Sequence, residues 1–253
     1  MPIPLSRRRL LRWAAGLALA ELAFERRPRA VAAAEADLAS ADRLRAQLEL
    51  CHPQGDPLEA LLAGNRRFAA LWQSTAGELE PRERMARLAA LWSDNCQPDP
   101  SALARGQRPW AAVLTCADSR VPPEWLFDVG PGELFDVRSA GNTPFHAGIA
   151  SLEYAVAELA VPLILVLGHS GCGAVTAAMG EAPLTPLLQE LVDPIRACLK
   201  PGMDLQAAIA ANARATAAAL PQGSALLAEA VAQRRLKVAA ATVEIGSGAV
   251  TLL

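Results

Sequence analysis

Three short apolar runs, each followed by a longer segment with helical character, constrain the fold of this chain more than any other feature. The runs are Ala111–Thr115, Leu134–Arg138 and Leu163–Leu167. They are rich in aliphatic residues, and the intervals between them are long enough for helical crossovers. This pattern predicts an α/β fold with a central, mostly parallel β-sheet flanked by helices. In such sheets, chemistry collects at the carboxyl ends of the strands.

Periodicity and turn residues predict the remaining elements. Residues 98–109 read as a connecting loop, and the end of the chain reads as a strand pair, 236–245 and 249–252, joined by a glycine turn. An Ala-rich, amphipathic stretch at 35–50 predicts an N-terminal helical extension. Helices are expected at 57–72, 80–92, 145–160, 173–179, 184–199, 204–219 and 223–235.

Length and composition favour one folded domain. The chain has 253 residues, of which 52% are hydrophobic, enough for one substantial core. We assign 1–34 to a signal peptide, 35–56 to an extension or linker, and 57–253 to the catalytic domain. The net charge is -2 and the sequence pI is about 6.0, so no concentrated basic surface suggests a nucleic-acid partner.

The N-terminus has the order of an export signal. Arg7, Arg8 and Arg9 precede a short apolar stretch, and small residues follow at 30–34, with cleavage expected after Ala32 or Ala34. The arginines resemble a twin-arginine signal, which implies the export machinery as a partner. The expected location is periplasmic or otherwise extracytoplasmic, including a thylakoid lumen or a membrane-associated state. The alternative is an amphipathic helix over 7–24 that packs on a partner or a membrane surface.

Cys116, His169 and Cys172 form a candidate zinc site. Cys116 directly follows the first predicted strand and His169 follows the third, so adjacent strands would bring them together. Two thiolates and one imidazole suit Zn²⁺, and three protein ligands leave a fourth position for water, as in catalytic sites. A fourth protein ligand from the other cysteines would instead close the site.

The three other cysteines are Cys51, Cys96 and Cys198. An oxidising compartment would permit a disulfide, and Cys51 with Cys96 is one pairing, because both lie outside the catalytic core. Buried free thiols are the favoured alternative, since cysteine packs well as a small hydrophobic residue.

Several motifs resemble those of the β-class carbonic anhydrases over about residues 57–253, most weakly between 180 and 222. The resemblance implies zinc-dependent, reversible hydration of carbon dioxide to bicarbonate and a proton. It also implies a homodimer or higher homo-oligomer in which N-terminal helices embrace the partner. The motifs are the runs 116–122, 132–135, 151–154 and 169–173, with Arg138 and Gly141-Asn142.

Asp118 and Arg120 are the predicted catalytic residues. Asp118 can accept a hydrogen bond from zinc-bound hydroxide and aim it at carbon dioxide. Arg120 can pair with Asp118 through a bidentate contact, which holds the carboxylate ionised and off the metal. The alternative for the two residues is an ordinary loop salt bridge.

By the same resemblance, Gln107, Phe135, Tyr154 and Gly173 match substrate-pocket positions, although plain core packing is an alternative for the two aromatic residues. Val113 stands where a bicarbonate-regulated subclass carries tryptophan. This predicts a site that is constitutively open.

Two rival functions fit the same residues. One is a zinc hydrolase of the same fold that acts on another small substrate, such as carbon disulfide. The other is a non-catalytic, zinc-bound bicarbonate sensor or assembly subunit. The Asp118 and Arg120 pair argues against the sensor, because a pure binder has no need of a pair that orients hydroxide.

Overall fold

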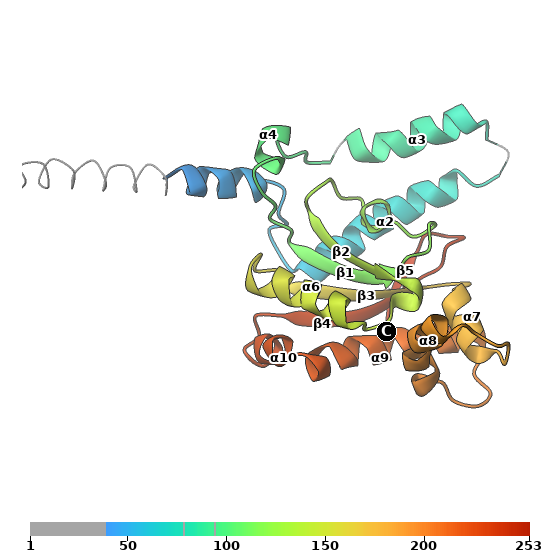
Figure 1. Cartoon of the computed structure of the whole chain (residues 1–253). Helices are drawn as coiled ribbons and strands as arrows, with labels where there is room; N and C mark the ends of the chain where they lie inside the picture. Colours follow the sequence, from blue (N-terminus) through green and yellow to red (C-terminus); the bar gives the residue numbers. More distant parts are fainter. Residues whose placement is uncertain (1–38, 78, 94) are drawn as a thin grey trace, which may run out of the picture. The chain divides into compact units, whose positions relative to one another are not determined.

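The computed structural model describes residues 39–77, 79–93 and 95–253 (Figure 1). The predicted export signal, residues 1–34, lies outside these residues. Residues 39–48 are helical, within the expected N-terminal extension. A compact unit spans Leu48–Leu253 and therefore includes residues 48–56, which the sequence placed in the extension.

The compact unit is built on one five-stranded sheet with the order β2-β1-β3-β4-β5 (Figure 1). The first four strands in this order run parallel, and β5 runs antiparallel to β4. All residues of β1 and β3 are buried, as expected of strands covered on both faces. The predicted α/β fold with a mostly parallel sheet is confirmed. The strands are β1 Ala111–Cys116, β2 Leu134–Ser139, β3 Leu163–His169, β4 Lys237–Val243 and β5 Val250–Leu252.

Helices cover both faces of the sheet and enclose two apolar cores. On one face, α2 (Pro57–Ser74) and α5 (Pro123–Phe127) pack against residues such as Val113 and Leu165. On the other, α6 (His146–Ala157), α9 (Leu205–Gly223) and α10 (Ala225–Ala232) pack against the alternate strand residues. The other helices are α3 Pro81–Ser93, α4 Pro100–Leu103, α7 Gly173–Met179, α8 Pro186–Cys198 and the 3₁₀ turn η1 Ala140–Asn142.

Two helices differ from the sequence prediction. Helix α4 lies within the segment expected to be a loop, where Asp99 caps it through Ser101 N and proline stands at its first position. Helix α9 runs through Pro221 to Gly223 instead of ending near residue 219. No helix within the described ranges is long and apolar enough to cross a membrane.

Cys51 and Cys96 form a disulfide, with their Cα atoms 5.4 Å apart. The favoured expectation of free thiols is therefore wrong for this pair. The bond joins the turn before α2 to the segment after α3. Next to Cys96, Asn95 Nδ2 donates to Asp128 Oδ1 at 2.8 Å, which also attaches this segment to the end of α5.

Candidate metal centre

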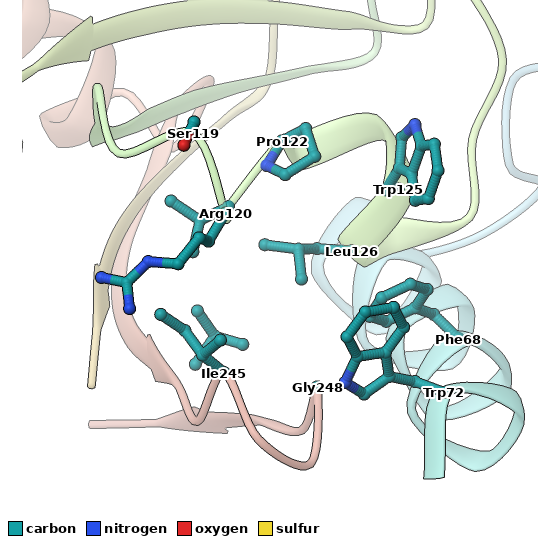
Figure 2. A pocket seen from close by; sticks show the side chains of 11 residues that line it. Phe68, Trp72, Ser119, Arg120, Pro122, Trp125, Leu126, Ile245 and Gly248 are labelled. Carbon is teal, nitrogen blue, oxygen red and sulfur yellow. The ribbon is translucent and has the colours of Figure 1, made fainter. Parts of the chain in front are cut away.

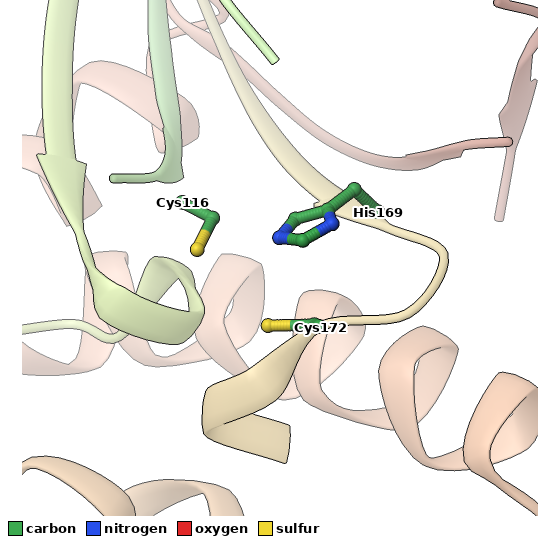
Figure 3. Close-up of side chains that lie close together, drawn as sticks. All are labelled: Cys116, His169 and Cys172. Carbon is green, nitrogen blue, oxygen red and sulfur yellow. The ribbon is translucent and has the colours of Figure 1, made fainter. Parts of the chain in front are cut away.

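The three predicted metal ligands come together at the carboxyl end of the sheet. Cys116 is the last residue of β1 and His169 the last of β3, and these strands are neighbours. Cys172 lies one short turn later and caps α7. The ligand atoms of the three residues lie within 4.8 Å of one another, and all three residues are buried. Figure 3 shows both sulfur atoms and the imidazole directed at one common point.

The imidazole of His169 is oriented for coordination. Its Nδ1 lies 3.0 Å from the Ser170 carbonyl oxygen, so Nδ1 carries the proton and donates it there. This leaves Nε2 with a lone pair directed at the sulfur atoms. Nε2 is buried and has no hydrogen-bond partner among the described residues. A buried, unpaired imidazole nitrogen beside two thiols fits a metal ion. Histidines that bind metals usually donate their other ring N–H to an acceptor such as a backbone carbonyl oxygen, as His169 does here.

Each sulfur atom has backbone N–H groups close to it. The Gly141 N–H donates to Cys116 Sγ at 3.2 Å, and the amides of Ala174 and Val175 lie at Cys172. A hydrogen bond from Cys172 lowers the pKa of the Cys116 thiol, and that same bond with burial raises the pKa of Cys172. A divalent cation that binds both sulfur atoms would displace the protons that they carry. This donor set fits zinc.

The other cysteines do not complete a closed site. Cys51 and Cys96 are joined to each other, and the partly buried Cys198 donates from Sγ to the Ile195 carbonyl oxygen at 3.0 Å. Within the described ranges, the cluster of possible metal ligands holds Cys116, His169 and Cys172 only. Three ligands on zinc leave a position for a small molecule.

Asp118 and Arg120 lie in the loop that follows β1. Arg120 donates from Nε to Asp118 Oδ1 at 2.9 Å and from Nη2 to Oδ2 at 2.6 Å, and its backbone N–H also reaches Oδ1 at 3.0 Å. These hydrogen bonds hold the pKa of Asp118 far below its usual range, against the effect of burial. Asp118 Oδ2 is 3.9 Å from His169 Nε2. An ionised carboxylate therefore stands beside the metal position.

Arg138, which the sequence marked only as part of the shared motifs, holds the loop between the first ligand and the carboxylate. Its Nε donates to the Cys116 carbonyl oxygen at 3.0 Å, and its Nη2 donates to the Asp118 carbonyl oxygen at 2.7 Å. Both ends of the segment that links the first ligand to the carboxylate are thus held from β2. The signal in the sequence was Arg138 at the end of the second apolar run.

The predicted substrate-pocket residues are not all brought to the metal within one chain. Gly173 directly follows Cys172, and a Cβ atom there would meet no atom within 4 Å, so space is open at this point. Gln107 is exposed and precedes β1, whose length of about 20 Å separates it from Cys116. Phe135 and Tyr154 contact each other, with ring centroids 6.3 Å apart, but Phe135 lies near the opposite end of β2 from the ligands.

An apolar cavity of about 460 Å³ borders the Asp118 loop. Figure 2 shows Arg120 on one side and the aromatic rings of Phe68, Trp72 and Trp125 on the other. Ser119 and Arg120 belong to its lining, whereas the three metal ligands do not. The cavity is therefore a neighbour of the metal centre and not the centre itself.

Fold and site together define an α/β protein with a buried Cys-His-Cys group that could hold a metal ion and an adjacent aspartate and arginine pair. The family model for carbonic anhydrase matches residues 111–250, which include every one of these residues. The chain belongs to the carbonic anhydrase family.

Relatives and solved structures agree with this assignment. The chain is 42% identical over 139 residues to a carbonic anhydrase of Mycolicibacterium smegmatis, covering 52% of this chain and 59% of the relative. It is 54% identical over 79 residues to carbonic anhydrase 2 of Mycobacterium tuberculosis, covering 31% of this chain and 38% of the relative. The matches thus span less than two thirds of either relative. A tetrameric β-carbonic anhydrase from Sordaria macrospora superposes with a TM-score of 0.54 at 27% identity, over 60% of this chain and 84% of that one.

Proposed function

We propose that this protein is a zinc enzyme that reversibly hydrates carbon dioxide to bicarbonate and a proton. The observation that carries the proposal is the ionised Asp118 carboxylate, with Oδ2 3.9 Å from the unpaired Nε2 of His169. Family membership and the relatives named carbonic anhydrase support it. Cys116, His169 and Cys172 would hold the zinc ion.

A bound zinc ion would supply a Lewis acid that makes water a nucleophile near neutral pH. Asp118 would orient the attacking water molecule. Because Arg120 occupies one side of each carboxylate oxygen, Oδ2 keeps a lone pair that can accept a hydrogen bond from the attacking water. Arg120 also prevents protonation of Asp118, so the acceptor is present throughout the physiological pH range.

The same pairing supports a site that is open under all working conditions. With both oxygen atoms bonded to Arg120, Asp118 would lose three hydrogen bonds by turning onto the metal. Val113, buried in β1, offers no polar group that could stabilise the turned state. The open space at Gly173 gives a small linear substrate room next to the ligands.

The direct test is stopped-flow carbon dioxide hydration by the purified, zinc-loaded protein, with the metal-depleted protein as control. We expect hydration that depends on bound zinc and rises toward alkaline pH. A fully metallated but inactive protein would overturn the proposal, and hydrolysis of carbon disulfide by that sample would identify the related hydrolase instead.

We also propose that the working form is a homo-oligomer. A similar fold occurs in a tetrameric β-carbonic anhydrase. Within one chain, Gln107 cannot reach the metal ligands, so it could touch substrate only at the site of a second copy. Analytical ultracentrifugation tests this proposal, and a monomer with full hydration activity would contradict it.

Finally, we propose that the protein works outside the cytoplasm after twin-arginine export. The disulfide between Cys51 and Cys96 supports an oxidising compartment. Replacing Arg7 and Arg8 with lysine should leave the protein in the cytoplasmic fraction of its host. Unchanged fractionation of that variant would exclude this route.

A further inference from the structure

Asn212 is a buried amide on the face of α9 that packs against the sheet. Its side chain is 1% exposed, and its neighbours in the helix, Ile209 and Ala213, belong to the apolar cores. Nδ2 donates to the Gly141 carbonyl oxygen at 2.8 Å. A buried amide in an apolar face costs free energy unless such bonds are made, so the bond to Gly141 is needed in the fold.

Gly141 is the residue that contacts the first metal ligand. Its N–H donates to Cys116 Sγ at 3.2 Å. Its φ of +73° is one that residues with a side chain rarely adopt, and the next residue, Asn142, also has a positive φ, of 47°. A Cβ atom on Gly141 would lie 2.7 Å from Ile195 Cδ1. This turn has an unusual backbone conformation that its surroundings must hold in place.

The two hydrogen bonds of Gly141 act on different peptide groups. The N–H that reaches Cys116 belongs to the peptide before Gly141, and the carbonyl oxygen that accepts from Asn212 belongs to the peptide after it. Because Asn212 holds the peptide after Gly141, the N–H can turn away from the sulfur only if φ or ψ of Gly141 changes. Asn212 can therefore restrict the direction of the donor without touching the metal ligand.

Helix α9 also supports the second ligand-bearing strand. A Cβ atom on Gly168, the residue before His169, would lie 3.1 Å from Ile209 Cγ2. Ile209 lies three residues before Asn212 in α9. The helix thus packs directly against the end of the strand that carries His169. One helix contacts the segments that position two of the three ligands.

We propose that Asn212 is a positioning residue for the metal centre, which holds Gly141 so that its N–H donates to the Cys116 sulfur and stabilises that sulfur as a ligand. The inference rests on the proposed zinc binding. Residues that support metal ligands by hydrogen bonds typically contribute about 10–100-fold to metal affinity.

The test compares Asn212→Leu with Thr216→Val. Leucine has nearly the size of asparagine and cannot donate. Thr216 lies one turn further along α9, is 1% exposed, and has a hydroxyl without a hydrogen-bond partner in the described structure. Its replacement is a matched polar-to-apolar change that leaves Gly141 untouched. Zinc affinity is measured by competition with a chromophoric chelator, and the cobalt-substituted proteins are compared by their thiolate-to-cobalt charge-transfer absorption.

We expect Asn212→Leu to bind zinc about 10–100-fold more weakly and to show a shifted charge-transfer band. Thr216→Val should match the wild type in both measurements. The inference would be overturned if Asn212→Leu had the zinc affinity and the charge-transfer band of the wild type. It would also be overturned if Thr216→Val lost as much zinc affinity as Asn212→Leu. If Asn212→Leu does not fold, Asn212→Ser, which stays polar but is too short to reach Gly141, decides by the same two readouts. A wild type that binds no zinc would refute the proposed function instead.

Discussion

Oδ2 of Asp118 lies 3.9 Å from Nε2 of His169, and no hydrogen bond joins them. The carboxylate instead accepts hydrogen bonds from Arg120, and the imidazole donates a hydrogen bond from Nδ1 to the Ser170 carbonyl oxygen. The two groups therefore face one point from two sides, each with a free lone pair. The lone pair on His169 Nε2 suits a metal cation, and the lone pair on Asp118 Oδ2 can accept a hydrogen bond from a water molecule.

This geometry predicts that Asp118→Ala separates catalysis from metal binding. The three ligands are untouched, so zinc content should stay at the wild-type level. Turnover should fall by about 100-fold or more, because the attacking water loses its acceptor. Stopped-flow hydration and metal analysis of the same sample check both parts.

Asp193→Ala is the control for Asp118→Ala. Asp193 is also paired with an arginine, Arg196, at 3.8 Å, but it is exposed and lies on α8. This variant should keep its activity. Full activity in Asp118→Ala would remove the carboxylate from the mechanism.

The sequence predicted the parts of the site that depend on local pattern. The apolar runs gave the parallel sheet, and the positions of Cys116 and His169 after two of these runs placed them at one edge. The bonds around them depend on strand register, which local pattern does not contain. Arg138 reaches the Cys116 carbonyl oxygen because Cys116 pairs with Ser139 across β1 and β2.

The disulfide likewise depends on tertiary structure that local sequence pattern does not contain. Cys51 and Cys96 are 45 residues apart, and their meeting depends on how the intervening helices fold back. Sequence could therefore name the pairing as one possibility but could not choose it over free thiols. Likewise, the hydrogen bond between Asn212 and Gly141 joins residues 71 positions apart.

Asp136 predicts a pH dependence of stability. Burial, together with the nearby Glu124 carboxylate, raises its pKa to about 7, although Arg138 opposes this. Its Oδ1 is buried without a hydrogen-bond partner in the described structure. Because the pKa is higher in the folded state, the folded protein binds more protons, and stability falls as pH rises from the unfolded pKa toward about 7.

Asp136→Asn should remove this dependence. Allowing for partial exposure of the side chain, we expect the wild type to lose roughly 2 kcal/mol relative to the variant between pH 5 and pH 8. Urea unfolding of both proteins at several pH values measures the difference. Glu124→Gln should move the wild-type transition to lower pH. Parallel stability curves for wild type and Asp136→Asn would contradict the assignment.

Reduction of the disulfide should lower stability and leave the metal centre intact. The bond closes a loop of 45 residues, and cross-links of this span stabilise by about 2–4 kcal/mol through the unfolded chain. Neither cysteine is a metal ligand, so hydration activity below the unfolding temperature should not change. Thermal unfolding with and without a non-thiol reductant measures the effect.

The variant in which both Cys51 and Cys96 are serine controls for other actions of the reductant. It should unfold at the temperature of the reduced wild type and show no further response. A reductant effect of equal size in this variant would show that the reductant does not act through the disulfide.

Gly64→Ala should destabilise the protein strongly. A Cβ atom at Gly64 would lie 1.9 Å from the Phe127 carbonyl oxygen, so α2 and α5 could not keep their close contact. Since the neighbouring atom is backbone, a side-chain rotation cannot relieve the clash, and we expect a loss of about 3 kcal/mol or more. Gly55→Ala is the matched control, because a Cβ there meets no atom within 4 Å.

A displacement of α5 by Gly64→Ala should also disturb the loop that carries Asp118 and Arg120. Helix α5 follows directly after the loop that carries Asp118 and Arg120, and Asn65 Nδ2, next to Gly64, donates to the Leu126 carbonyl oxygen at 2.9 Å. Displacing α5 should therefore reduce hydration activity even in the folded fraction, whereas Gly55→Ala should leave it unchanged. Activity per folded molecule, from hydration rates and the folded fraction at each temperature, separates the two effects. Wild-type stability in Gly64→Ala would show that the contact between α2 and α5 is looser than the structure indicates.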